Sequence, residues 1–151
     1  MVRSEIKTAA FYSRVSDLSQ VEKYSLDAQE RLFHELCERR GWAIADVYRE
    51  EGRSAHSDSI RKRPVFKQLL DDAASGKFDV VVVHTLDRWA RNLRVQIESL
   101  ALLSENGVAF VSISEKMDYS TPEGRMQMQF LGVFSEYFSD SLGKHVSKGL
   151  T

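Results

Sequence analysis

The segment Asp79–His84 constrains the fold of this chain more than any other part of its sequence. It reads Asp-Val-Val-Val-Val-His, so a strand here would carry apolar, β-branched side chains on both of its faces. Such a strand is typical of the interior of a parallel sheet that helices cover on each side. The segment therefore predicts the central strand of an α/β sheet.

The segments before and after this strand alternate between strand and helix patterns. The expected elements are strands over 6–15, 42–48 and 108–113 and helices over 25–40, 64–74 and 92–103. Two polar stretches, 16–23 and 50–63, are expected to be surface loops. The order β-α-β-α-β-α-β predicts an α/β fold: an open, mostly parallel sheet with helices on both faces, in Rossmann-type layers.

The sequence after residue 120 has a different pattern. An apolar residue recurs every four positions, at Met126, Phe130, Phe134, Phe138, Leu142, Val146 and Leu150. A helix over 121–149 would extend about 40 Å, which is too long for so small a sheet. We therefore divide the chain into an α/β catalytic core, residues 1–120, and a long helix of the same domain, residues 121–151. The first half of this helix is expected to pack on the sheet.

The second half of that helix is expected to meet another subunit, because a projecting apolar stripe would otherwise remain in water. The expected interface residues are Phe130, Phe134, Tyr137, Phe138 and Leu142. Dimers or tetramers would result. The alternative is a helix that packs wholly within its own chain.

Composition limits the classes of function. The formal net charge of −1 argues against indiscriminate nucleic-acid binding, although basic residues cluster at Arg61–Lys67 and at Arg88–Arg94. The single cysteine, Cys37, lies with Leu32 and Phe33 on the apolar face of the predicted helix 25–40, so its expected role is core packing. No apolar run approaches the roughly 18 residues of a membrane span, and no signal peptide is evident, so an intracellular protein is expected.

Residues with chemical potential lie where the predicted strands end, which is where sites form in open α/β sheets. At the end of the first strand, alternation places Arg14 and Ser16 on one side and Ser13 on the other. A hydroxyl group then lies beside a guanidinium. The alternative is an ordinary serine at the end of a strand.

The turn after the central strand contains Asp87, Arg88 and Arg91. If this turn is helical, all three side chains share one face, and two guanidiniums point into the crevice. Arginine binds phosphate oxygens through paired hydrogen bonds and stays charged, which suits phosphoryl transfer without a metal. The alternative is a surface ion pair between Asp87 and Arg91.

Five motifs occur in order along the chain. They are Tyr12-x-Arg14-Val15-Ser16, Ser25-Leu26-x-x-Gln29, Arg63-Pro64, Leu86-Asp87-Arg88-x-x-Arg91 and Asp118-x-Ser120-Thr121-Pro122-x-Gly124. Together they resemble the catalytic domain of the serine recombinases, the family of resolvases, invertases and large serine integrases, over nearly the whole chain. The segment 134–139 is most similar to the large integrases. One departure is that Glu50 and Ala55 stand where the family commonly has Asp and Gly.

The resemblance implies a site-specific DNA recombinase. Ser16 would attack a phosphorus of the DNA backbone, which gives a 5′-phosphoserine link and a free 3′-hydroxyl; strand exchange and religation would follow without metal or ATP. The guanidiniums that would bind the nonbridging oxygens belong to Arg14, Arg63, Arg88 and Arg91.

The resemblance also implies supporting roles. Gln29 and Ser54 would support the phosphate contacts. Asp87 would orient an arginine or help a proton reach the leaving 3′-oxygen, and the choice between these roles is open. No cofactor or metal is expected, because no His, Cys and carboxylate cluster has ligand spacing; His56 and His84 are the only histidines near the crevice.

The expected partners are DNA, at attachment or resolution sites, and further copies of the chain in a homodimer or homotetramer, without a membrane or a small-molecule substrate. The expected location is the cytoplasm of a bacterial, phage or mobile-element host. The family's DNA-reading C-terminal domains are not in this sequence, so we expect a catalytic fragment or a naturally short relative. The alternative is a non-catalytic α/β binding or dimerisation module.

Overall fold

The computed structural model describes residues 6–15, 20–51 and 63–150, and the side chains of 6–15, 25–51 and 63–137. The strands are β1 (Thr8–Val15), β2 (Ala43–Glu51), β3 (Val80–Val83), β4 (Ala109–Ser112) and β5 (Met117–Asp118). The helices are α1 (Gln20–Arg40), α2 (Pro64–Ala74), α3 (Leu86–Trp89), α4 (Leu93–Glu105) and α5 (Pro122–Leu150). Strands and helices alternate as far as β3, as the sequence pattern predicts, and two helices, α3 and α4, then lead to β4.

The strands form one sheet with the order β2-β1-β3-β4-β5. The first four are parallel, and the two-residue strand β5, which the sequence analysis did not predict, pairs antiparallel with β4. β3 lies in the middle of the sheet, and its four valines are fully buried. The predicted open, mostly parallel α/β sheet with a valine-rich central strand is confirmed.

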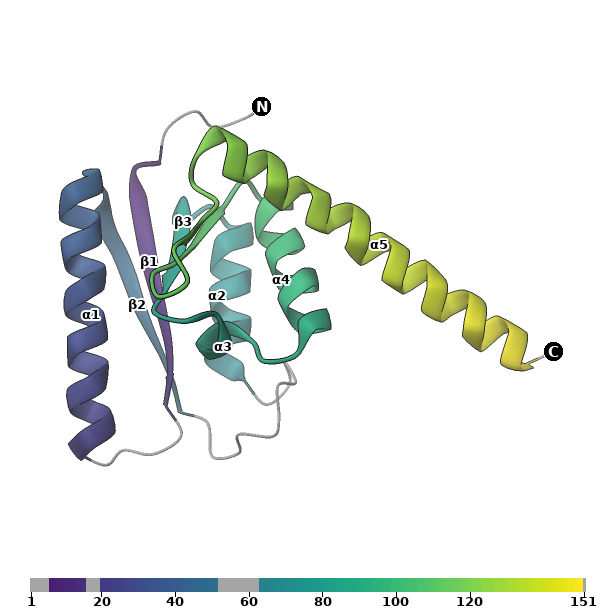
Figure 1. Ribbon diagram of the computed structural model, residues 1–151, viewed down its shortest axis with the longest axis horizontal. Coiled ribbons are helices and arrows are strands. Elements are labelled where there is room, and N and C mark those ends of the chain that lie inside the picture. The colour runs from purple at the N-terminus through teal and green to yellow at the C-terminus, as the bar shows by residue number, and fades with distance from the viewer. Residues whose placement is uncertain (1–5, 16–19, 52–62, 151) are drawn as a thin grey trace.

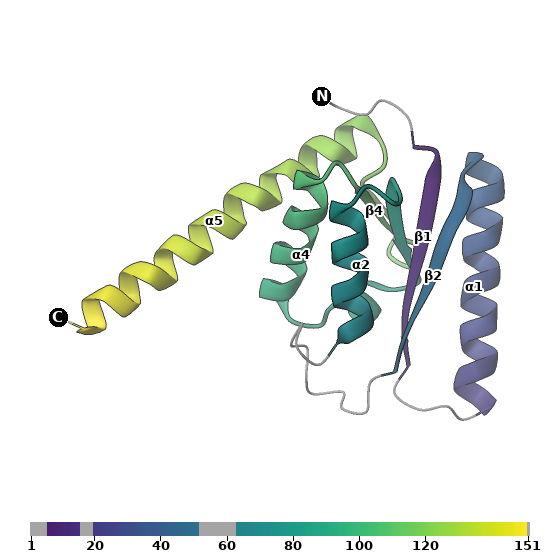
Figure 2. The same ribbon diagram turned by 180° about the vertical axis from the view of Figure 1, so that it is seen from behind.

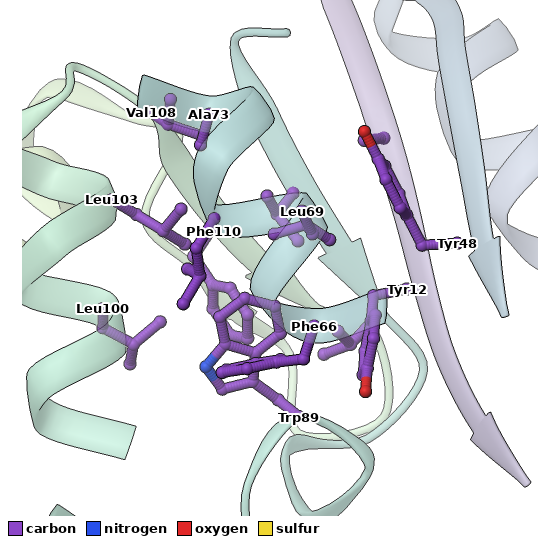
Figure 3. Packing of buried hydrophobic residues seen from close by; sticks show 14 of the residues in the cluster. Tyr12, Tyr48, Phe66, Leu69, Ala73, Trp89, Leu100, Leu103, Val108 and Phe110 are labelled. Carbon is purple, nitrogen blue, oxygen red and sulfur yellow. The ribbon is translucent and has the colours of Figure 1, made fainter. Parts of the chain in front are cut away.

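Helices cover the two faces of the sheet unequally (Figures 1 and 2). On one face α1 packs alone, and Phe33 of α1 stacks on Phe11 of β1 with 5.0 Å between ring centroids. On the other face α2, α3, α4 and the start of α5 enclose a larger aromatic cluster around Trp89 (Figure 3). Alternate residues of β1 therefore enter different cores, as the strand period requires.

Two boundaries differ from those predicted by more than two residues. Helix α1 begins at Gln20, within the predicted loop 16–23, because the polar residues there are good helix formers. The early start was not predicted because this stretch shows no apolar period. Strand β2 continues to Glu51, beyond the predicted end at Tyr48, because Glu50 and Glu51 still pair with the end of β1. The Glu50 side chain is buried. On α1 itself, Cys37 is buried as predicted, and burial raises its pKa to about 11, whereas Leu32 is 40% exposed.

Helix α5 begins against α4 and then leaves the body of the molecule (Figure 1). Met128, in its second turn, is buried in the cluster that also contains Phe110 of β4, and the first turns pack mainly on α4. At Gly124 a Cβ atom would lie 2.5 Å from the carbonyl oxygen of Asp118 and 2.7 Å from Cα of Tyr119. Only glycine lets the first turn close so tightly on the preceding chain. No helix in the described residues is long and apolar enough to cross a membrane.

Candidate active site

The end of β1 supplies the first part of the site. Ser13 is buried and continues the row of Ala9 and Phe11 that faces α1, whereas Arg14 is partly exposed. This confirms that Ser13 and Arg14 point to opposite sides. Ser16 lies outside the described residues, so its position beside Arg14 stays a prediction.

The short helix α3 supplies the second part. Arg88 Nη1 donates a hydrogen bond of 2.6 Å to the carbonyl oxygen of Arg14, so the structure brings the end of β1 and the turn after β3 into contact. The carboxylate of Asp87 is exposed and accepts a hydrogen bond of 2.5 Å from the Thr85 hydroxyl. Two of the predicted segments thus meet at the carboxyl edge of the sheet.

The predicted common helical face of Asp87, Arg88 and Arg91 is wrong. The helix ends at Trp89, and Ala90 is extended, with φ −162° and ψ 136°. The chain has to straighten here because the next helix starts only three residues later, where the Asn92 side chain accepts hydrogen bonds from two backbone N–H groups of α4. Arg91 is exposed in this connection and does not lie one turn beyond Arg88.

Arg63, predicted to bind phosphate, lies inside the core. Its side chain is 1% exposed, and its guanidinium lies over the Phe66 ring at 3.8 Å from the centroid. Nη2 donates to the Tyr12 hydroxyl at 2.9 Å and to the carbonyl oxygen of Trp89. A direct phosphate contact would require these contacts to open. That role of Arg63 stays a prediction.

Glu50 joins the same network, a role that the sequence analysis missed. Its carboxylate accepts hydrogen bonds from the Tyr12 hydroxyl at 3.1 Å and from the backbone N–H groups of Phe66 at 2.9 Å and Val65 at 3.1 Å. A buried carboxylate therefore caps the N-terminus of α2, where the helix dipole favours negative charge. Burial raises the pKa of Tyr12, so its hydroxyl stays protonated and can donate. The signal in the sequence was that Glu50 stands at a position where the family it resembles commonly has Asp.

Trp89 anchors α3 in the aromatic cluster (Figure 3). Its side chain is fully buried, with ring centroids 4.5 Å from Phe66, 5.3 Å from Phe110 and 5.7 Å from Tyr12. Its indole N–H donates to the Ser99 hydroxyl of α4 at 2.9 Å. Since Trp89 directly follows Arg88, this packing holds the backbone of Arg88 in place.

Glu115, in the turn between β4 and β5, holds the other end of α3. Its two carboxylate oxygens accept from the Leu86 N–H at 3.2 and 3.1 Å, and one of them also accepts from the Ser112 hydroxyl. Glu115 is exposed; desolvation acts to raise its pKa, but the hydrogen bonds from Ser112 and Leu86 outweigh this effect and lower the pKa. Nothing in the sequence distinguishes this glutamate from other surface acids.

The remaining predicted residues are not gathered at this edge by the described contacts. Gln29 is buried on α1, against the opposite face of the sheet from Trp89, and donates to the Ser25 hydroxyl at 3.3 Å. His84 follows β3 and is half-buried. Ser54 and His56 lie outside the residues that the structure describes. No group of three His, Cys, Asp or Glu side chains in the described ranges can hold a metal ion. That the reaction uses no metal stays a prediction.

The accessible residues at this edge include three arginines as well as the exposed acids Asp87 and Glu115. Arg14 and Arg88 are partly exposed, and Arg91 is exposed. Guanidiniums fixed by hydrogen bonds can bind the charged oxygens of a phosphate and stabilise a transition state that carries more charge there. The arrangement suits phosphoryl transfer.

Comparison with known proteins identifies the family. Residues 9–151 match the family described as Resolvase, N terminal domain, and the chain belongs to this family. It is 31% identical over 139 residues to a probable DNA-invertase, y4cG, of Sinorhizobium fredii, and 35% identical over 95 residues to the transposon Tn552 resolvase of Staphylococcus aureus. These matches cover 92% and 62% of this chain.

Solved structures agree with this assignment. The crystal structure of the N-terminal catalytic domain of TP901-1 integrase superposes with a TM-score of 0.72 at 29% identity, and covers 89% of this chain and 98% of that one. A resolvase family site-specific recombinase from Streptococcus pneumoniae, at 24% identity and a TM-score of 0.67, shares the fold. The chain spans only 40% of the S. fredii protein and 47% of the Tn552 resolvase.

Proposed function

We propose that this chain is the catalytic domain of a site-specific DNA recombinase that cleaves and rejoins DNA through Ser16. The observation that carries the proposal is the hydrogen bond from Arg88 to the carbonyl oxygen of Arg14, which brings two arginine-bearing segments to the edge where β1 leads into Ser16. The relatives named as a DNA-invertase, a resolvase and an integrase support the same activity.

The proposed reaction exchanges one phosphate ester for another. The Ser16 oxygen bonds to a backbone phosphorus, the bond from phosphorus to the 3′-oxygen breaks, and the 3′-oxygen takes up a proton while the serine loses one. Arg14, Arg88 and Arg91 bind the nonbridging oxygens and stabilise the added charge. Religation is the reverse reaction with a new 3′-hydroxyl, so it needs no energy source.

Asp87 stands beside Arg88 on the exposed side of α3 and is proposed to assist this proton transfer or to orient an arginine. Arg63, Gln29 and Ser54 are proposed to support the phosphate site, Arg63 from within the core. We propose that the exposed apolar residues of α5, together with Phe138 and Leu142, form the contact between subunits, and that the DNA substrate lies in the cytoplasm of a bacterial or phage-infected cell.

The test is a covalent adduct assay with a randomised pool of duplex DNA labelled on one strand. The unmodified chain should give a protein–DNA adduct that survives denaturation, and mass spectrometry of the digested adduct should find the nucleotide on Ser16. Ser16→Ala should give none. Ser13→Ala, which changes a buried serine that points to the other side of β1, is the matched control and should retain the adduct. An adduct that persists in Ser16→Ala would overturn the proposal.

A further inference from the structure

Helix α3 contains four residues, so its own backbone hydrogen bonds cannot hold it in place. Side chains from other elements do so instead. Arg63 donates to the carbonyl oxygen of Trp89 at its end, and the Gln96 side chain donates to the carbonyl oxygen of Ala90 at 2.5 Å. At its start the backbone N–H of Leu86 is held by Glu115 alone among the contacts of the described residues.

The Glu115 contact differs from the other two because it accepts from a backbone N–H of α3, whereas Arg63 and Gln96 donate to backbone carbonyl oxygens. A carboxylate that accepts from a backbone N–H forms a stronger hydrogen bond than a neutral acceptor does. The Ser112 hydroxyl fixes the carboxylate from the side of β4, so the Leu86 N–H is tied to the sheet through one side chain. Leu86 directly precedes Asp87 and Arg88, so displacement of this N–H displaces both.

The turn that carries Glu115 is itself held in an unusual conformation. Lys116 has φ 56°, in the left-handed region that non-glycine residues rarely adopt, and its N–H donates to the carbonyl oxygen of Ile113 at 3.2 Å. This turn lets β5 reverse direction and pair with β4. The backbone thus accepts strain at the residue next to Glu115.

We propose that Glu115 is a positioning residue, which sets the place of Asp87 and Arg88 at the scissile phosphate by anchoring the first N–H of α3. The inference rests on the proposed function for its catalytic consequence. Glu115 acts through Arg88 and takes no part in proton transfer.

The test compares Glu115→Ala and Glu115→Gln with Glu105→Ala, a matched control at an exposed glutamate at the end of α4. The first readout is hydrogen exchange at the Leu86 amide, followed by NMR. Glu115→Ala should speed this exchange by about tenfold or more, because a hydrogen bond to a charged group is lost. Glu115→Gln should speed it less, since an amide oxygen still accepts, and Glu105→Ala should leave it unchanged.

The second readout is the rate of adduct formation on the randomised duplex pool at saturating DNA. Glu115→Ala should slow it between about tenfold and 10²-fold, as displacement of a catalytic group by about 1 Å does, without a matching loss of DNA affinity. Glu115→Gln should retain most of the rate. In an Arg88→Ala background, Glu115→Ala should cost less than in the unmodified chain, because only the placement of Asp87 remains to be lost.

Three results would overturn the inference: unchanged exchange at Leu86 in both Glu115 variants, a Gln variant as slow as the Ala variant, or additive losses with Arg88→Ala. If Glu115→Ala does not fold, the exchange and rate of Glu115→Gln decide alone. An unmodified chain that forms no adduct would count against the proposed function, while the exchange data would still confirm or refute the anchor.

Discussion

The four-residue helix α3 and the 29-residue helix α5 differ in what determines their place in the molecule. Helix α3 is held along its whole length: Glu115 binds its start, the Trp89 side chain packs in the core, and Arg63 binds its end. Among the described side chains of α5, Met128 near its start is buried, whereas Phe130, Val133, Phe134 and Tyr137 are more than half exposed. Two of the catalytic candidates, Asp87 and Arg88, lie on the first helix, and the candidate subunit contact lies on the second.

This difference separates two tasks. A phosphate site needs groups held to a fraction of an ångström, and a short segment anchored from several sides provides that. A subunit contact needs an accessible apolar area, and a long helix leaving the body provides that. Substitutions near α3 should therefore change stability and catalysis, whereas substitutions along α5 should change assembly.

The largest effect on stability is expected where α3 enters the core. Trp89→Ala should lower the free energy of unfolding by about 3–5 kcal/mol, because it leaves a cavity between the Phe66, Phe110 and Tyr12 rings. Urea unfolding measures this loss. Trp89→Phe keeps an aromatic ring but loses the hydrogen bond to the Ser99 hydroxyl, and it should cost less. A loss below about 1 kcal/mol in Trp89→Ala would mean that α3 does not depend on its anchor.

The next largest effect is expected in catalysis. Arg88→Ala should slow adduct formation by about 10²-fold or more, as removal of one donor to the transition state does. Arg88→Lys should restore little, because lysine lacks the planar fork. The control is Arg94→Ala, an exposed arginine paired with Glu98 on α4, which should retain the rate of the unmodified chain. Equal rates for the two alanine variants would remove Arg88 from the site.

The third effect tests α5 and should leave the core intact. Phe130→Glu combined with Phe134→Glu should shift the chain from oligomer to monomer in sedimentation velocity, because charges in an apolar contact remain without partners. Gln127→Glu combined with Gln129→Glu adds the same charge at exposed positions of the same helix and should leave the oligomer in place. A monomer for the unmodified chain at high concentration would contradict the proposed contact.

The smallest effect is expected at Asp118 in β5, which lies between the turn of Glu115 and the start of α5. Partial burial acts to raise the pKa of Asp118, but hydrogen bonds from Ser120 and Arg40 outweigh it and lower the pKa. Because the folded-state pKa is lowered, the stabilisation is present at neutral pH and is lost as the pH falls through that pKa, below the ordinary value of about 3.9.

Asp118→Asn should therefore cost at most about 1 kcal/mol at pH 7, since Arg40 is 40% exposed, and less near pH 3, where part of that stabilisation is already lost. Urea unfolding at the two pH values measures both. Equal losses at the two pH values would show that the charge of Asp118 does not contribute.

Apolar patterns and helix ends made most of the fold predictable. The four valines of β3 indicated the centre of the sheet, Pro64 marked the first residue of α2, and Asn92 marked the cap of α4. These signals are local, because each residue acts on its own strand or helix. The length of α5 followed from a repeat of four residues for the same reason.

The contacts that shape the site were not predictable in this way. Glu50, Arg63 and Glu115 are charged residues that each form hydrogen bonds to partners 15 or more positions away along the chain. A charged residue in a polar stretch gives no sign that it will be buried, because burial depends on partners that only the folded chain brings near. The end of α3 at Trp89 was not predicted for a related reason. The Trp89 side chain packs in the core, and the backbone at Ala90 is extended and does not continue the helix.

The seat of α5 at Gly124 has a mechanical consequence. The helix is about 43 Å long at 1.5 Å per residue, and the structure holds it only near its first turns, so it behaves as a lever with a short fixed end. A rotation of about 10° at the seat would carry the far end through about 7 Å, which is more than one helical turn. Because the Gly124 backbone lies against that of Asp118 and Tyr119, a single added methyl group at Gly124 would change the direction of the α5 axis.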